Sequence, residues 1–280
     1  MSSCFSPFTF KQLAQEIRAL LLRLALQAYR RSSFLLAGLL QPLLWLVLFG
    51  ALFQKFMLPI FSDKAIYYDD FLSSGIIVFT AFTSSLNAGL PIMFDREFGF
   101  FNRLLVVPMT SRLSIVIASF FYIVCITAIQ MFTVWIIASI KNGTHTIVNL
   151  NAFFYCSLIL LLLICLVTIF SIILSFILSG HIELLALILL INLPILFSST
   201  ALAPLTFMPT WLQFIATINP LTYAIEALRY TVTFNKFIVG QKIIVTVLGY
   251  LSVEDVILYF FILNCSMILV ANYFFHRKLE

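Results

Sequence analysis

The sequence predicts an all-α, polytopic membrane protein, and three observations support this fold class. Of its 280 residues, 62% are hydrophobic, 10% are charged and 31 are phenylalanine. A soluble domain carries about 25% charged residues, so this composition excludes an ordinary soluble protein. The charge-free stretches reach the roughly 20 residues that a helix needs to cross a bilayer. The basic residues flank these stretches, so the net charge of +5 gives no reason to expect a nucleic-acid partner.

Six transmembrane helices are predicted from the charge-free stretches. The predicted spans are residues 32–54, 71–94, 113–140, 152–178, 184 to about 203, and 256–276. Pro42 lies in the middle of the first and predicts a kink, which membranes tolerate where neighbouring helices satisfy the freed carbonyl. The second is rich in small and polar residues, which either pack against neighbouring helices or line a substrate path.

An amphipathic segment precedes the first span. Its apolar residues recur at helical spacing, and most of its basic residues lie off that face. The apolar set is Leu13, Ile17, Leu20, Leu21, Leu24 and Ala28. Residues 1–31 are therefore expected to form a cytoplasmic interfacial helix on an anionic membrane surface. An ordinary basic tail is the alternative.

Orientation follows from the distribution of positive charge. An even number of spans places both termini, and the loop at residues 94–112, on one side of the membrane. Ten of the 16 Lys and Arg residues fall on that side. Because positive residues accumulate on the cytoplasmic side, the termini and this loop are predicted to be cytoplasmic.

Residues 94–112, FDREFGFFNRLLVVPMTSR, form the central loop between the second and third spans. If a helix begins at Phe94, one face carries Phe94, Phe98, Phe101 and Leu105, with Arg96 and Arg103 almost opposite. Pro108 would end this helix, because proline disfavours helical geometry in the preceding residue. A short amphipathic helix between two spans suits the docking of a partner, whereas a solvated connection is the plain alternative.

The proline-rich segment, residues 194–230, does not fit a simple span. The charge-free run from 184 to 225 is 42 residues long and contains Pro204, Pro209 and Pro220. It is too long for one span and too broken for two. Short re-entrant helices that enter the outer leaflet without crossing satisfy both constraints, provided that protein or a wet cavity surrounds them. Glu226 and Arg229 lie at i and i+3, as a structural ion pair or as a substrate contact.

The central loop resembles the cytoplasmic coupling loop of the ABC type-2 transporter permeases, whose usual pattern is FDRE-x-G-T-x-x-RLL-x-x-P. The matching residues are Asp95, Arg96, Glu97, Gly99, Arg103, Leu104, Leu105 and Pro108. Phe100 replaces the usual threonine, which could alter the local fit. In that family the loop presses into a cleft on the ATP-binding subunit. The resemblance therefore implies that these residues, with Phe98 and Phe101, couple the chain to an ATPase.

The proline-rich segment resembles a second pattern of the same family, P-x-x-F-x-S-x-x-x-x-P-x-x-x-M-P-x-W-L-Q followed by N-P-L-T-Y-x-x-x-x-x-R. The resemblance therefore covers nearly the whole chain. The family's re-entrant helices close the outer end of the translocation path. The residues that this implies for an outer gate are Pro204, Pro209, Trp211, Asn219, Pro220, Tyr223, Glu226 and Arg229. By the stretch LLQPLLWLVLFGALFQ, the chain most resembles the branch found in cyanobacteria and algal plastids. Residues 32–280 would then be one permease domain, with a coupling loop at 94–112 and a gate region at 204–235.

The resemblance implies the membrane subunit of an ABC exporter, not an enzyme. No glycine is followed by lysine, so the chain has no phosphate-binding loop. ATP and Mg²⁺ are expected on a separate ATP-binding subunit, and no cofactor on this chain. The implied partners are that subunit, a second permease copy in a homodimer, and the bilayer of a bacterial plasma membrane or a plastid. An amphiphilic or lipid-like substrate is expected.

Other classes fit the sequence less well. A secondary transporter needs ionisable residues at mid-membrane, and the predicted spans offer none apart from Glu183 at a span end. A membrane hydrolase or metal site needs clustered nucleophiles or ligands. His145, His181 and His276 are far apart in sequence, and the five cysteines form no CxxC pair. A membrane scaffold that transports nothing remains the alternative, although it leaves the coupling loop and the prolines unexplained.

Overall fold

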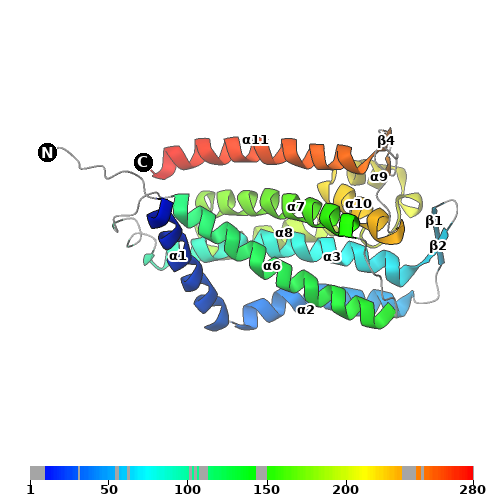
Figure 1. Ribbon diagram of the computed structural model, residues 1–280, viewed down its shortest axis with the longest axis horizontal. Helices are drawn as coiled ribbons and strands as arrows, with labels where there is room; N and C mark the ends of the chain where they lie inside the picture. The colour runs from blue at the N-terminus through cyan, green and yellow to red at the C-terminus, as the bar shows by residue number, and fades with distance from the viewer. Residues whose placement is uncertain are drawn as a thin grey trace.

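The computed structural model describes residues 10–30, 32–53, 57–61, 64–100, 103, 106, 113–142, 150–234, 244–246 and 249–279. Long helices run along the long axis of an elongated molecule, and α1 crosses it obliquely near one end (Figure 1). The helices are α1 (Phe10–Arg30), α2 (Ser32–Leu52), α3 (Tyr68–Leu86), α4 (Leu90–Glu97), α6 (Leu113–Asn142), α7 (Leu150–Ile177), α8 (His181–Phe197), α9 (Thr210–Ile218), α10 (Pro220–Phe234) and α11 (Val253–Leu279). Two 3₁₀ turns are η1 (Asn87–Gly89) and η2 (Leu205–Phe207).

Two β-hairpins were not predicted from the sequence. Strand β1 (Met57–Phe61) pairs antiparallel with β2 (Lys64–Tyr67), in the connection between the first two predicted spans. Strand β3 (Ile244–Thr246) pairs antiparallel with β4 (Gly249–Leu251), just before α11. Both hairpins lie at the end of the molecule that also holds α9 and the start of α11 (Figure 1).

The helical membrane character predicted from composition is confirmed. Within the described ranges, four helices are long and apolar enough to cross a bilayer: Tyr68–Glu97, Ser114–Ile140, Phe153–Ile177 and Val253–Tyr273. The stretches Gly38–Leu52 in α2 and His181–Phe197 in α8 are shorter apolar helices. The six-span topology therefore stays a prediction.

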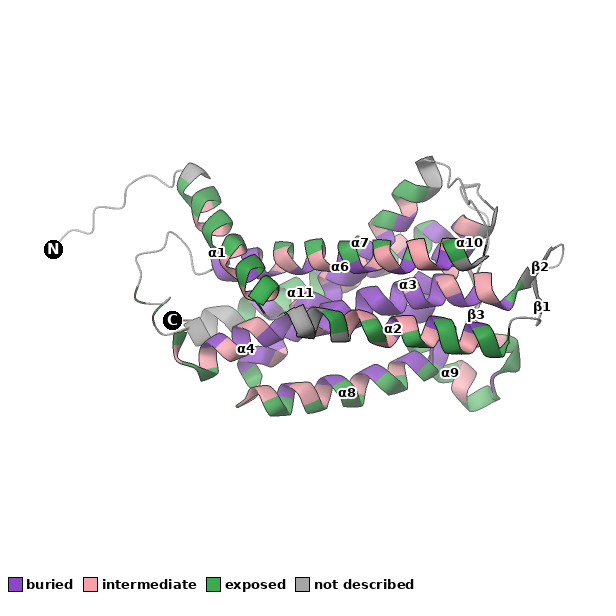
Figure 2. Ribbon diagram, turned by 90° about the horizontal axis from the view of Figure 1, so that it is seen from below, coloured by how far each residue is buried: buried purple, intermediate pink, exposed green. Residues whose placement is uncertain are grey.

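Helix α3 is the centre of the core. It packs against α2, α6, α7 and α10, and Phe71, Leu72, Ile76 and Phe79 on it are fully buried. Figure 2 shows α3 as largely buried, whereas α1, α2 and α8 carry long exposed faces. Large apolar side chains are exposed on α2, α6, α8 and α11, including Leu48, Ile129, Leu190 and Leu269. Apolar residues on the outside and small polar ones around the core are what a bilayer solvent favours.

The two ends of the molecule differ. The C-terminal end of α11, α1 and α4 lie at one end, and the hairpins and α9 lie at the other (Figures 1 and 2). This arrangement places α1 and the start of the central loop together, as the predicted topology requires.

Candidate functional site

The prediction of a helix that begins at Phe94 and continues past Phe98 is wrong. Helix α4 begins at Leu90, as a continuation of α3 through η1, and ends at Glu97. Gly99 has a φ of 72°, in the left-handed region that glycine adopts most readily, and this ends the helix. The apolar face proposed to run from Phe94 through Phe98 is therefore interrupted directly after Phe98.

Part of the predicted coupling set lies outside the described residues. Phe101, Leu104, Leu105 and Pro108 belong to that part. Beyond Gly99, Phe100, Arg103 and Val106 have helical backbone and are exposed. Phe98 is 69% exposed and Val106 is 84% exposed. These apolar side chains are available to a partner.

Asp95 faces the interior and not the surface. It is 7% exposed and forms an ion pair with Arg23 of α1. The Arg23 guanidinium also lies 4.0 Å from the centre of the Phe100 ring, a cation–π contact. Arg23 thus joins α1 both to the end of α4 and to Phe100 beyond Gly99.

Arg96 binds the C-terminal end of α7. Its Nη1 donates hydrogen bonds to the carbonyl oxygens of Ser175 and Leu178, the latter at 3.4 Å. The last carbonyls of a helix lack intrahelical donors and carry a partial negative charge, so a guanidinium is well suited to this position.

Glu97 binds the N-terminal end of α8. Its Oε2 accepts a hydrogen bond from the backbone N–H of His181 at 3.1 Å and lies 2.5 Å from His181 Nδ1. A carboxylate at a helix N-terminus satisfies an otherwise unpaired N–H and interacts favourably with the helix dipole. Sequence reasoning did not identify His181 or Arg23 as partners of these acids.

The three consecutive charged residues Asp95, Arg96 and Glu97, here called the charged triplet, therefore contact three different helices. The partners are α1, α7 and α8 respectively. The sequence predicted a role in coupling for the triplet but no internal partners. A displacement of the triplet would therefore alter contacts with all three helices.

The proline-rich segment forms short helices whose starts coincide with prolines. Pro209 precedes α9 and Pro220 is the first residue of α10, positions where proline is favoured because no backbone N–H is needed. Asn219 Oδ1 accepts a hydrogen bond from the Leu221 N–H at 3.0 Å. Its Nδ2 donates to the Ile195 carbonyl at 2.8 Å. Asn219 thus caps α10 and holds it to the end of α8. Re-entrant placement in the outer leaflet stays a prediction.

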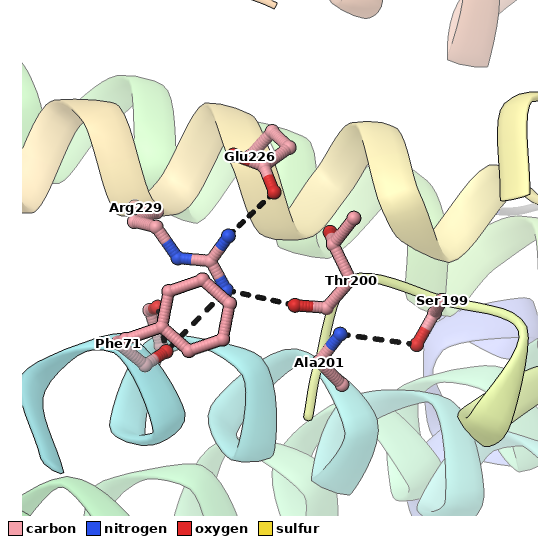
Figure 3. A network of polar contacts seen from close by, with 7 residues as sticks. Phe71, Ser199, Thr200, Ala201, Glu226 and Arg229 are labelled. Atoms are coloured by element: carbon pink, nitrogen blue, oxygen red, sulfur yellow. Dashed lines mark hydrogen bonds and ion pairs between the residues drawn. The ribbon is translucent and has the colours of Figure 1, made fainter. Parts of the chain in front are cut away.

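Arg229 is buried where three segments meet (Figure 3). It is 2% exposed, and Nη1 lies 2.5 Å from Glu226 Oε1. Nη2 donates to the carbonyl oxygens of Thr200 at 2.9 Å and Phe71 at 3.4 Å. The guanidinium carbon lies 3.6 Å from the centre of the Phe71 ring. Of the two alternatives left open by the sequence, these contacts favour a structural ion pair.

Of the remaining residues predicted for the outer gate, Pro204 and Pro209 line one cavity, whereas Trp211 and Tyr223 do not. Trp211 is 64% exposed, and Pro209 is exposed. Tyr223 is buried, and its hydroxyl donates to the Thr217 carbonyl at 2.5 Å. Pro204 lines an apolar cavity of ≈ 510 Å³ between α2, the start of α3, the end of α8 and the segment up to α9. Among the described residues, no group of three His, Cys, Asp or Glu side chains could hold a metal ion.

These features define a polytopic helical membrane protein in which α1 is tied to the end of α4, exposed apolar residues follow α4, and Asn219 caps α10 in the proline-rich segment. The family model described as ABC-2 type transporter matches residues 15–233. The chain therefore belongs to the ABC-2 type transporter family, as the two sequence patterns predicted.

Relatives from algal plastids are similar over most of the chain. Each is named putative transport permease ycf38. The protein from Porphyra purpurea is 51% identical over 246 residues, covering 88% of this chain and 84% of the relative. The Pyropia yezoensis protein is 55% identical over 218 residues, covering 78% and 74%. The Cyanophora paradoxa protein is 47% identical over 245 residues, covering 86% and 81%. A multi-pass protein of a bacterial or plastid membrane agrees with all three.

Proposed function

We propose that this chain is the transmembrane permease subunit of an ATP-driven exporter, acting as a homodimer with a separate ABC ATPase. Membership of the ABC-2 family and relatives named as transport permeases support the permease role. The apolar, uncharged helices support an amphiphilic or lipid-like substrate. ATP and Mg²⁺ would bind to the ATPase.

The observation that carries this proposal is the geometry at the end of α4. Phe98 before Gly99, and Phe100 and Val106 after it in the chain, expose apolar surface. Exposed apolar surface beyond the end of a membrane helix suits a protein partner. Directly before them, the charged triplet binds α1, α7 and α8. Movement of a docked ATPase would therefore pull on the permease core through the triplet.

The proposal includes six membrane crossings, with α2 and α8 added to the four long helices. Helix α8 has 17 residues, or about 26 Å at 1.5 Å per residue, slightly less than the roughly 30 Å hydrocarbon core. A short span is accommodated by local thinning of the bilayer at modest cost. Helices α9 and α10 would then sit as re-entrant pieces that close the outer end of the path.

The test is affinity purification of the whole chain in mild detergent, with mass spectrometry of the proteins that accompany it. An ABC ATPase should co-purify with the wild-type chain. Phe98→Asp, alone and with Phe101→Asp, should reduce its recovery at least tenfold, because a carboxylate replaces apolar contact. Phe207→Asp is the matched control, since Phe207 is also exposed, at 59%, but belongs to η2, far from α4 in the chain.

Two outcomes would contradict the proposal. If the chain purifies alone under conditions that preserve other ABC complexes, an ATP-independent scaffold becomes the better interpretation. If the ATPase co-purifies equally with both Phe98 variants, the ATPase docks elsewhere and the assignment of the central loop is wrong.

A further inference from the structure

A second cavity lies close to the charged triplet, inside a single copy of the chain. It measures ≈ 160 Å³, is partly open, and lies between α1, α2, the α3–η1–α4 segment and α6. Its polar lining residues are Gln27, Ser84, Asn87, Tyr122 and Gln130, and the rest of its lining is apolar or glycine. None of the residues predicted for the outer gate lines it.

Polar groups in this cavity have unused hydrogen-bonding capacity. Gln130 is only 7% exposed, and its side-chain amide makes no hydrogen bond within the part of the chain that the structure describes. Asn87 Nδ2 donates to the Thr83 carbonyl at 2.9 Å, which leaves its Oδ1 free of described partners. Ser84 Oγ accepts from Thr127 at 3.0 Å, and its own proton is available. These atoms can be reached from the cavity, so a ligand there can pair with them.

The lining also restricts the charge of the ligand. None of the lining residues is acidic or basic. Arg23 and Asp95, the chain neighbours of the lining residues Leu24 and Phe94, pair with each other. A charged group would enter a low-dielectric site without a counter-ion, which is costly. Amide and hydroxyl side chains offer both donors and acceptors, a combination that matches the hydroxyl groups of an uncharged polar molecule.

The exposed apolar residues next to the cavity on α1 indicate that the ligand comes from the bilayer. Its α1 wall contributes Leu24, Gln27 and Ala28. Beside them on the same helix, Leu26 is 57% exposed and Tyr29 is 84% exposed. Exposed apolar residues on an amphipathic helix indicate contact with a bilayer. The volume is below the roughly 300 Å³ of a typical small-molecule site, so the cavity suits a headgroup whose chains remain in the membrane.

We propose that this cavity binds the uncharged, hydroxyl-bearing headgroup of a bilayer lipid. Gln130 and Asn87 supply the polar contacts, and Leu24 and Phe94 form apolar walls. Phe94 directly precedes the charged triplet, and Arg23 precedes Leu24. Bound lipid would therefore stabilise the contact between α1 and α4.

The test is photocrosslinking in proteoliposomes that contain the full chain. The probes are a diacylglycerol hexoside and a phosphatidylcholine with matched acyl chains, each carrying a diazirine on the headgroup. The hexoside should label α1 and α6 at least tenfold more than the phosphatidylcholine does. A soluble methyl hexoside should not compete.

Two variants probe the cavity itself. Gln130→Leu should raise the hexoside concentration needed for half-maximal labelling about fivefold to tenfold, since a buried hydrogen-bonding partner is lost. Gln41→Leu makes the same change at a residue that does not line the cavity. Gly38→Phe should block labelling by filling the space. Gly38→Ala is its control, because a Cβ there would lie 3.6 Å from Gln130 Nε2, an ordinary contact.

Three results would overturn the proposal: equal labelling by phosphatidylcholine, competition by the soluble hexoside, or unchanged labelling in both Gln130→Leu and Gly38→Phe. Because the assay uses this chain alone, it does not depend on an ATPase partner. Failure here would leave the proposed permease function untouched, and failure of the co-purification test would leave the lipid site untouched.

Discussion

Arg229 shows how a full charge is accommodated in a largely apolar core. Its guanidinium is held by Glu226, by two backbone carbonyls and by the face of Phe71. Burying a charge is costly unless it is paired and hydrogen-bonded, and a planar guanidinium can meet several partners at once. The residue thereby joins α10, α3 and the segment after α8.

Arg229→Met should lower the free energy of unfolding by about 3 kcal/mol, because Glu226 loses its partner and two carbonyls lose their donor. Glu226→Gln should cost clearly less, since an amide can still accept a hydrogen bond from the guanidinium. Thermal unfolding of the two purified variants in one detergent measures the difference. A melting temperature of Arg229→Met equal to that of the wild type would contradict a structural role.

The attachment of α1 to α4 also depends on single residues. Asp95 is nearly buried, and its carboxylate pairs with Arg23. Asp95→Asn should increase hydrogen exchange of α1 amides about tenfold, because breaking a partly buried pair lowers the free energy needed to open the helix.

Arg23→Gln should have a similar effect, and the double variant should add little to either single change, as expected for residues that act on each other. Arg18→Gln is a control on the exposed side of the same helix. Additive effects of the two changes would show that the pair does not hold α1 in place.

One serine on α7 binds the backbone at the break between α3 and α4. Ser171 Oγ accepts a hydrogen bond from the Gly89 N–H at 2.9 Å and donates to the Leu86 carbonyl. The backbones are so close that a Cβ on Gly89 would lie 2.4 Å from the Ser171 carbonyl oxygen. Gly89 is therefore required by packing and not by its own dihedral angles.

Gly89→Ala should separate α7 from η1 and destabilise the protein by roughly 1–3 kcal/mol, the cost of overpacking. Gly180→Ala is the matched control, because a Cβ at that position meets nothing within 4 Å. Thermal unfolding of the two variants is the measurement. If both variants have the melting temperature of the wild type, the close approach at Gly89 does not constrain the fold.

Sequence patterns predict a helix well where the surrounding solvent determines its extent. They predict it poorly where a single residue, such as Gly99, ends it. The long helices followed from hydropathy, because a bilayer leaves few alternatives for a charge-free stretch. The break at Gly99 was missed because the spacing of Phe94, Phe98, Phe101 and Leu105 continues across it. The hairpins were missed because their strands have three to five residues and lie in short connections.

The partners of the candidate site were the least predictable. The charged triplet itself was found from its pattern, but Arg23 lies 72 residues from Asp95, and His181 lies 84 residues from Glu97. Helical periodicity relates residues within a few turns and carries no information about such distances. The one usable signal was topological, because span counting placed all four residues on the same side of the membrane.

Whether α2 and α8 cross the membrane determines which elements of the molecule face the cytoplasm. With six crossings, the end that holds the hairpins and α9 faces away from the cytoplasm, and the proposed ATPase docking site and the proposed lipid cavity lie toward the other end. If only the four long helices cross, α9 would lie on the same side as the start of α8. The proline-rich segment could not then close an outer path.

Cysteine labelling separates these topologies. In a chain without native cysteines, single cysteines replace the exposed residues Tyr67, Ser179 and Thr210. Six crossings predict that a membrane-impermeant maleimide reaches Tyr67→Cys and Thr210→Cys from one side and Ser179→Cys only from the other. Equal access to Ser179→Cys and Thr210→Cys from one side would mean that α8 does not cross. The proposed outer gate would then be wrong, while the packing around Arg229 would stand, since it depends on contacts within the chain and not on the bilayer.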